Sequence, residues 1–167
     1  MAPTDVINRN SQRSVPLWLF ALVVALIAGR LALRQSPGEP SQPKKSATLV
    51  KWVPAADAVR LAQQSGRPIM YEFTADWCAP CRRMDAQVFQ NPTVAERINR
   101  GFIPVRITDR QREEGKNAPE VARLQNLYNV SGFPTVVFVD ANGGLKKRMV
   151  GYGGRAAFEQ QLAALAQ

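Results

Sequence analysis

The sequence predicts an α/β domain built on a mixed sheet with helices on both faces, preceded by one transmembrane helix. Three observations support this fold class. From Trp52 onward, short apolar runs alternate with helix-like segments. Near the C-terminus, a short turn that contains two glycines joins two strand-like runs, which must therefore be antiparallel. Near the N-terminus, residues 15–33 form a separate apolar segment.

The apolar segment at 15–33 has nineteen residues and one charge, Arg30, and about 20 residues are needed to cross a bilayer as a helix. We interpret it as an uncleaved signal anchor. A cleaved signal peptide is the alternative, although Arg30 falls inside the only plausible cleavage window. Residues 1–14 are predicted to be a disordered tail, and the proline-rich residues 34–49 a linker.

The positive charge is densest around the anchor. The net charge is +9, and up to Lys51 there are seven basic residues against two acidic ones. This pattern fits membrane-flanking charge, and no basic stripe interleaved with aromatic residues indicates a nucleic-acid partner. The charges that follow the anchor favour a cytoplasmic domain, whereas the short tail before it favours export. We expect export.

Residues 50–167 are predicted to form the α/β domain. Its elements are expected in the following order: a helix at Ala55–Gln64, a buried central strand at Ile69–Thr74, a helix from about Ala79 to Gln90, a helix at Thr93–Asn99, a strand at Phe102–Thr108, a charged loop at Asp109–Asn117, a helix at Pro119–Tyr128, strands at Thr135–Val139 and Leu145–Val150, and a helix at Arg155–Ala166.

Cys78 and Cys81 are the only cysteines, and they lie where the central strand meets the next helix. A helix that begins near Cys78 directs its unpaired N–H groups and the positive end of its dipole toward that sulfur, which favours the thiolate. The thiolate is the form that attacks disulfides, and Cys81, one turn later, can resolve a mixed disulfide. The pair therefore predicts a dithiol redox centre.

Other uses of the two cysteines are less well supported. A disulfide that closes so short a loop stabilises little. Structural zinc needs four ligands, and the chain has no further cysteine and no histidine, so we expect no metal. A metal half-site shared by two chains and an inert pair remain the alternatives. The absence of histidine also removes the usual general bases and catalytic triads, and we expect no cofactor.

Two motifs carry a family resemblance: Trp-Cys-Ala-Pro-Cys at 77–81, after an apolar strand, and Gly-Phe-Pro-Thr at 132–135, before a hairpin. Together they resemble the thioredoxin family over residues 50–167. The resemblance implies a thioredoxin-like fold in which Cys78 is an exposed nucleophile and Cys81 a buried resolving thiol.

The same resemblance implies that Pro134 is a cis-proline whose loop lies against the active-site disulfide. A cis bond there leaves the backbone of Phe133 free to pair with an extended substrate, so Trp77, Phe133 and Pro134 are expected to bind substrate. From the sequence alone, an ordinary trans turn is the alternative.

Glu72 lies six residues before Cys78, where thioredoxins carry a buried acid that handles the proton of the resolving cysteine. In a buried strand its carboxyl group would have a raised pKa, as that role needs. Because glutamate is longer than the usual aspartate, its reach differs, and a solvent-exposed glutamate at a strand edge is the alternative. Asp76 and Asp85 are interpreted as solvated or capping groups.

Within the family, Ala-Asp-Trp-Cys at 75–78 and Val-Phe-Gln-Asn-Pro-Thr-Val at 88–94 are similar to the C-terminal domain of membrane thiol–disulfide interchange reductases. Those domains pass electrons to periplasmic acceptors, so the similarity implies a periplasmic domain, and with the anchor at 15–33 we expect a single-pass protein of the bacterial inner membrane. It also implies disulfide-containing protein clients and a separate membrane or soluble electron donor.

The dipeptide between the cysteines, Ala79-Pro80, lacks the histidine of strongly oxidising pairs. We therefore expect a reductase or disulfide-exchange role. The alternatives are a redox-inert thioredoxin-fold module that binds or chaperones clients, and a membrane thioredoxin that faces the cytoplasm.

Overall fold

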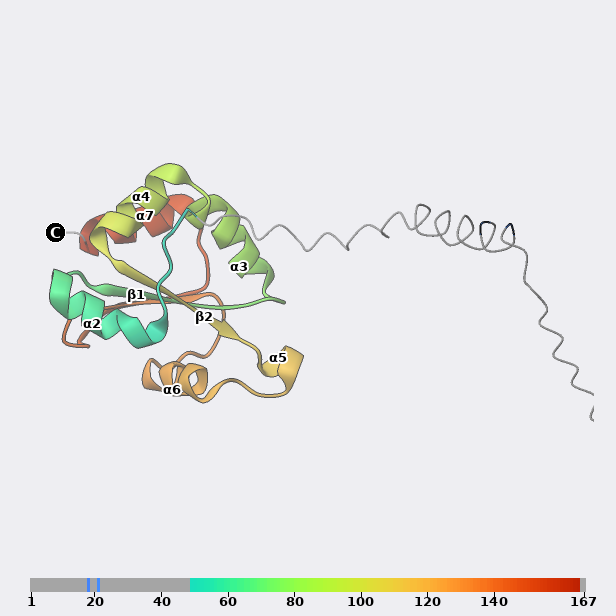
Figure 1. The fold of residues 1–167 in the computed structure, drawn as a ribbon. Coiled ribbons are helices and arrows are strands. Elements are labelled where there is room, and N and C mark those ends of the chain that lie inside the picture. Colours follow the sequence, from blue (N-terminus) through green and yellow to red (C-terminus); the bar gives the residue numbers. More distant parts are fainter. Residues whose placement is uncertain (1–17, 19–20, 22–48, 166–167) are drawn as a thin grey trace, which may run out of the picture. The chain divides into compact units, whose positions relative to one another are not determined.

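A computed structural model describes residues 18, 21 and 49–165 (Figure 1). The predicted tail, anchor and linker lie outside the described residues, apart from Trp18, Ala21 and Leu49. In the part of the chain that the structure describes, no helix combines the length and the apolar character that crossing a bilayer requires.

Four strands form one sheet in the order β2-β1-β3-β4. β1 pairs parallel with β2 and antiparallel with β3, and β3 pairs antiparallel with β4, so the predicted mixed sheet is confirmed. In the turn between the last two strands, Gly143 has a φ of 88°, which glycine adopts without a steric penalty. The strands are β1 (Ile69–Ala75), β2 (Ile103–Asp109), β3 (Thr135–Val139) and β4 (Leu145–Val150).

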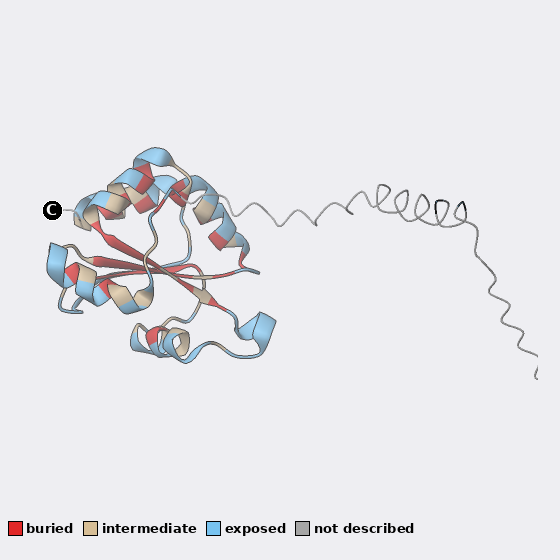
Figure 2. Cartoon of the chain, viewed as in Figure 1, coloured by how far each residue is buried: buried red, intermediate tan, exposed pale blue. Residues whose placement is uncertain are grey.

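Helices cover both faces of the sheet, as predicted (Figure 1). One layer contains the helices α3, α4 and α7, and the opposite layer contains α2 and α6. The strands between the two layers are largely buried, whereas the outer faces of the helices are exposed (Figure 2). The helices are α2 (Ala55–Ser65), α3 (Ala79–Met84), α4 (Pro92–Gly101), α5 (Gln111–Glu114), α6 (Pro119–Leu127) and α7 (Arg155–Leu165).

Side chains of β1 alternate between the two layers, as they do in any strand. Ile69, Tyr71 and Phe73 belong to the core beneath α2 and α6. Met70 belongs to the core beneath α4 and α7. By the same alternation, Glu72 points to the side of Met70, where the helix that follows the cysteines packs. The sheet thus places a carboxyl group directly under the site.

The long helix expected from Ala79 to Gln90 is not uniform. Its second half, η1 (Asp85–Phe89), is a π-helix, and the N–H of Gln90 donates to the carbonyl of Asp85 at 2.9 Å. The wider turn lets the adjacent side chains of Val88 and Phe89 both enter the core, where each is fully buried. The loop expected at 109–117 also differs, because it contains the short helix α5.

Candidate active site

The two cysteines lie at the start of α3, directly after β1. Cys78 caps the helix in an extended conformation, and its N–H donates to the carbonyl of Ala75 at 3.1 Å. The N–H of Cys81 donates to Cys78 Sγ at 3.2 Å. Pro80 stands in the first turn, where no N–H donor is needed. Cys78 and Cys81 are joined by a disulfide, and their Cα atoms are 5.3 Å apart.

Both cysteines are buried in this disulfide-bonded state. Cys78 is 2% exposed and Cys81 4%, so the expectation that Cys78 is exposed is wrong for this state. Phe133 and Ala75 pack against the pair and cover it. Trp77 remains 44% exposed. The accessible surface at the site therefore belongs to the side chains next to the sulfurs.

The loop opposite the cysteines contains the Phe133–Pro134 peptide bond, which is cis, as the resemblance implied. The Phe133 ring meets the Trp77 ring edge-on, with 5.9 Å between their centroids. The carbonyl of Pro134 accepts the N–H of Gly151 at 2.7 Å. Among the described residues, the N–H and carbonyl of Phe133 have no hydrogen-bond partner. Substrate contact by Trp77, Phe133 and Pro134 stays a prediction.

Glu72 is buried, with 1% of the residue exposed, so the alternative of a solvated glutamate at a strand edge does not hold. It lies opposite Arg106 in the β1–β2 register, and Arg106 Nε donates to Glu72 Oε2 at 2.6 Å. Burial raises the pKa of Glu72, and the charge and hydrogen bond of Arg106 act in the opposite direction.

Arg106 also joins a second carboxylate to this pair. Its Nη2 donates to Asp85 Oδ1 at 2.8 Å, so Asp85 is an ion-pair partner and not simply a solvated group. The guanidinium carbon lies 4.3 Å from the ring centroid of Trp52 and 5.3 Å from that of Phe89. These two rings hold the guanidinium in place and limit the access of water to it.

One pocket is lined by Cys81 and by all three members of this ion-pair cluster, Glu72, Arg106 and Asp85. Cys81 and Glu72 thus share a polar cavity that the apolar core does not separate. Asp76 lines its outer part, is mostly exposed, and pairs with Arg110 at 2.9 Å. A proton-transfer role for Glu72 stays a prediction.

The sequence reasoning did not anticipate Arg106. A signal was available, since Arg106 is the one charged residue inside the apolar run of β2 before its last residue, as Glu72 is in β1. Two opposite charges inside neighbouring buried strands favour a cross-strand pair.

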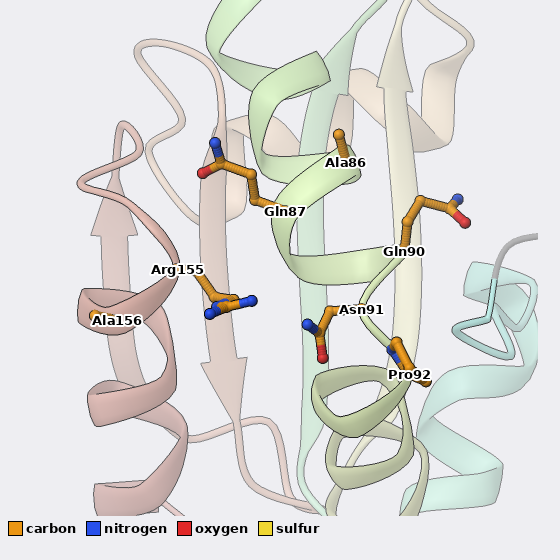
Figure 3. A pocket seen from close by; sticks show the side chains of 7 residues that line it. All are labelled: Ala86, Gln87, Gln90, Asn91, Pro92, Arg155 and Ala156. Carbon is orange, nitrogen blue, oxygen red and sulfur yellow. The ribbon is translucent and has the colours of Figure 1, made fainter.

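A second pocket lies beside the disulfide and is lined by Trp77, Phe133 and residues of α5, including Arg112. A third lies between η1 and the start of α7, where Gln87, Asn91 and Arg155 line it, and contains none of the predicted site residues (Figure 3). Within the described part of the chain, no group of three or more cysteine or carboxylate side chains is arranged to hold a metal ion.

These features define a class of protein. A Cys-x-x-Cys disulfide at a helix start, a cis-proline loop packed against it and a buried carboxyl group beneath it, on this mixed sheet, form the site of a thioredoxin-type thiol–disulfide oxidoreductase. The thioredoxin-like domain family matches residues 55–166, and the chain belongs to that family.

Comparison with known proteins indicates the same branch of the thioredoxin family as the sequence motifs do. The thiol:disulfide interchange protein DsbD of Klebsiella pneumoniae is 29% identical over 149 residues, which are 86% of this chain and 24% of that protein. The chain thus spans about a quarter of the length of the curated relatives it matches. The predicted resemblance to the interchange branch of the thioredoxin family is confirmed.

Solved structures agree with the fold. The DsbH oxidoreductase structure is 26% identical, with a TM-score of 0.61, and the match covers 82% of this chain and 97% of that one. A thioredoxin from Thermus thermophilus is 30% identical, with a TM-score of 0.58, and the match covers 69% of this chain and 85% of that one.

Proposed function

We propose that the chain is a membrane-anchored oxidoreductase that reduces or exchanges the disulfides of exported proteins through Cys78 and Cys81. The observation that carries this proposal is the hydrogen bond from the Cys81 N–H to Cys78 Sγ in the disulfide-bonded protein, because a donor kept in this position favours the Cys78 thiolate after reduction. The proposal further states that the domain lies in the periplasm and that electrons flow from it to its clients.

The proposed reaction consumes one dithiol and one client disulfide. The Cys78 thiolate attacks a client sulfur, forms a mixed disulfide and releases the other client sulfur as a thiolate, which takes up a proton. Cys81, deprotonated with the help of Glu72, then attacks Cys78 Sγ and releases the second client thiolate. Two electrons and two protons reach the client, and Cys78–Cys81 becomes a disulfide. A dithiol of another protein resets it by the same exchange.

The surroundings of Cys78 support a reductase better than an oxidant. An oxidant needs a strongly stabilised thiolate, for which a histidine or other cation beside the sulfur is the usual device. Here Ala79 and Pro80 separate the cysteines, and the guanidinium of Arg82 is bound to the carbonyl of Asp76 at 2.8 Å. One backbone N–H donor to the sulfur gives a moderate effect.

The reduction potential of the pair tests the direction. The purified full chain is equilibrated to constancy in glutathione or dithiothreitol buffers. A midpoint of roughly −270 to −200 mV supports donation of electrons to clients, and one near −120 mV overturns it in favour of an oxidant. The absence of any two-electron transition would leave a redox-inert binding module.

A trapping experiment tests the exchange step separately. In Cys81→Ser the mixed disulfide has no resolving thiol, so clients are expected to stay covalently bound to Cys78 and to be released by dithiothreitol. The Cys78→Ser/Cys81→Ser double variant is the matched control. Equal recovery of clients by both variants would refute exchange and indicate non-covalent binding.

The membrane part of the proposal rests on residues 15–33. If the chain crosses the inner membrane once and its domain lies in the periplasm, a periplasm-active reporter fused after residue 167 should be active. Activity of a cytoplasm-specific reporter at the same position would reverse the orientation.

A further inference from the structure

The pocket beside the disulfide has two different walls. Trp77 and Phe133 form an aromatic wall, and Phe133 also packs against both cysteines. The other wall is the short helix α5, with Gln111 and Arg112. Neither cysteine lines the pocket, but Trp77 directly precedes Cys78 and Phe133 contacts both cysteines, so the pocket adjoins the disulfide.

Arg112 carries a positive charge that no described residue neutralises. Its guanidinium carbon lies 5.5 Å from the ring centroid of Trp77, and among the described residues it forms no hydrogen bond or ion pair. The ring attracts the charge of the guanidinium without occupying its N–H donors, which match the two oxygens of a carboxylate.

The other charged groups near this pocket are hydrogen-bonded, ion-paired or outside its lining, to which Glu113 and Glu114 of α5 do not belong. Asp109 is 7% exposed and lines the pocket, but its carboxylate accepts the N–H of Gln111 and the side-chain amides of Asn117 and Gln125. The guanidinium of Arg110 is paired with Asp76. Asp109 keeps its negative charge, but its oxygens are occupied by these donors, so Arg112 is the charged group of the lining that has donors left for a ligand.

Further hydrogen bonds within this loop hold α5 in position. The N–H of Arg110 donates to Asn117 Oδ1 at 2.6 Å, and the Gln111 side chain donates to the carbonyl of Gly115 at 2.6 Å. These contacts close the loop on itself at both ends. The wall that carries Arg112 is thus formed before a ligand arrives, which lowers the entropy cost of binding.

We propose that this pocket receives an acidic side chain of an extended client segment, close to the client's disulfide, and that Arg112 selects it. An extended segment that pairs with the free N–H and carbonyl of Phe133 projects alternate side chains to opposite sides, and one of them enters the pocket. The inference rests on the proposed function, since it names the class of client that the same site prefers.

The test is a competition for covalent trapping. The full-length Cys81→Ser chain, reduced and freed of reductant, is mixed with equal amounts of two peptides, each with an internal disulfide. The peptides differ only in the residues beside their cysteines, which are glutamate in one and lysine in the other. The ratio of the two mixed disulfides is read by mass spectrometry. We expect the glutamate peptide to be favoured by about fivefold, as for one partly screened charge pair, with the ratio falling as salt rises.

Arg112 is then changed in the same background. Arg112→Ala is expected to bring the ratio close to one, and Arg112→Glu to invert it. Arg100→Ala removes an exposed arginine of α4 that does not line the pocket, and the ratio should remain as in the parent. A ratio that Arg112→Ala and Arg112→Glu leave unchanged, or equal trapping by the parent, overturns the inference alone. Trapping of neither peptide overturns the proposed function with it.

Discussion

Replacing Arg106 with methionine should destabilise the domain in a pH-dependent way. The Glu72 side chain is 2% exposed and Arg106 is its ion-pair partner, so the substitution leaves a buried carboxylate without a counter-charge. Such a loss typically costs about 3 to 5 kcal/mol of unfolding free energy. Methionine retains an apolar stem against Trp52 and Phe89, so the electrostatic loss dominates.

The sign of the pH dependence follows from the pKa of Glu72. Burial already raises this pKa, and removing Arg106 removes the charge that opposes the rise. A carboxyl group whose pKa is raised in the folded state contributes to stability, and this contribution is complete below the pKa of the unfolded state, about 4.3. The contribution is lost as pH rises through the pKa of the folded state. The deficit of Arg106→Met should therefore be smaller at about pH 5 than at about pH 8.

Urea unfolding of the disulfide-bonded full chain at these two pH values measures the effect. Two further variants control it: Arg106→Lys keeps the charge, and Glu72→Gln/Arg106→Met removes the carboxylate. The double variant should be more stable than Arg106→Met at pH 8. The reasoning is refuted if the deficit of Arg106→Met is equal at both pH values, or if the double variant recovers nothing.

Two further predictions concern groups outside this ion-pair cluster. Asp109→Ala leaves the amides of Asn117 and Gln125 without their shared acceptor. We therefore expect a loss of about 2 kcal/mol of unfolding free energy and faster amide exchange in the surrounding loop. The control Glu114→Ala, on the same loop, should change the unfolding free energy by less than about 0.5 kcal/mol. Exchange rates that match for both variants would contradict this. Burial raises the pKa of Tyr71 from 10.0 to about 12, so ultraviolet titration should show it still protonated at about pH 11, and stability should fall between about pH 10 and 12 because the unfolded tyrosine ionises first. In Tyr71→Phe this part of the fall should be absent, and a single titration of all tyrosines near pH 10 would refute it.

The last two strands illustrate what the sequence can predict. Thr135–Val139 and Leu145–Val150 have the predicted bounds, because an apolar run, a glycine turn and a second run fix both strands locally. The redox role of the two cysteines can also be predicted from the sequence, because their spacing and their position at a helix start place both sulfurs within one helical turn. In both cases the decisive contacts lie close together in the sequence.

The remaining features depend on contacts between distant residues. The ion pair of Glu72 with Arg106 joins residues 34 apart, and the β1–β2 register that creates it cannot be derived from either strand alone. Cys78 is buried in a cluster that includes Phe133, which lies in a loop far along the chain. The position of Arg112 depends on the hydrogen bonds by which Asp109 closes its loop. The charged composition of that loop does not predict which way the Arg112 side chain points.

The enclosure of the sulfurs also bears on kinetics. A dissolved thiol must approach in line with the sulfur–sulfur bond, yet Cys78 and Cys81 expose only 2% and 4% of their surface when joined. We therefore expect small thiols to reduce the bond more slowly than a protein donor that displaces the contacting Phe133. On this expectation, the redox state of the domain follows the supply of electrons from the proposed donor more closely than it follows the surrounding thiol pool.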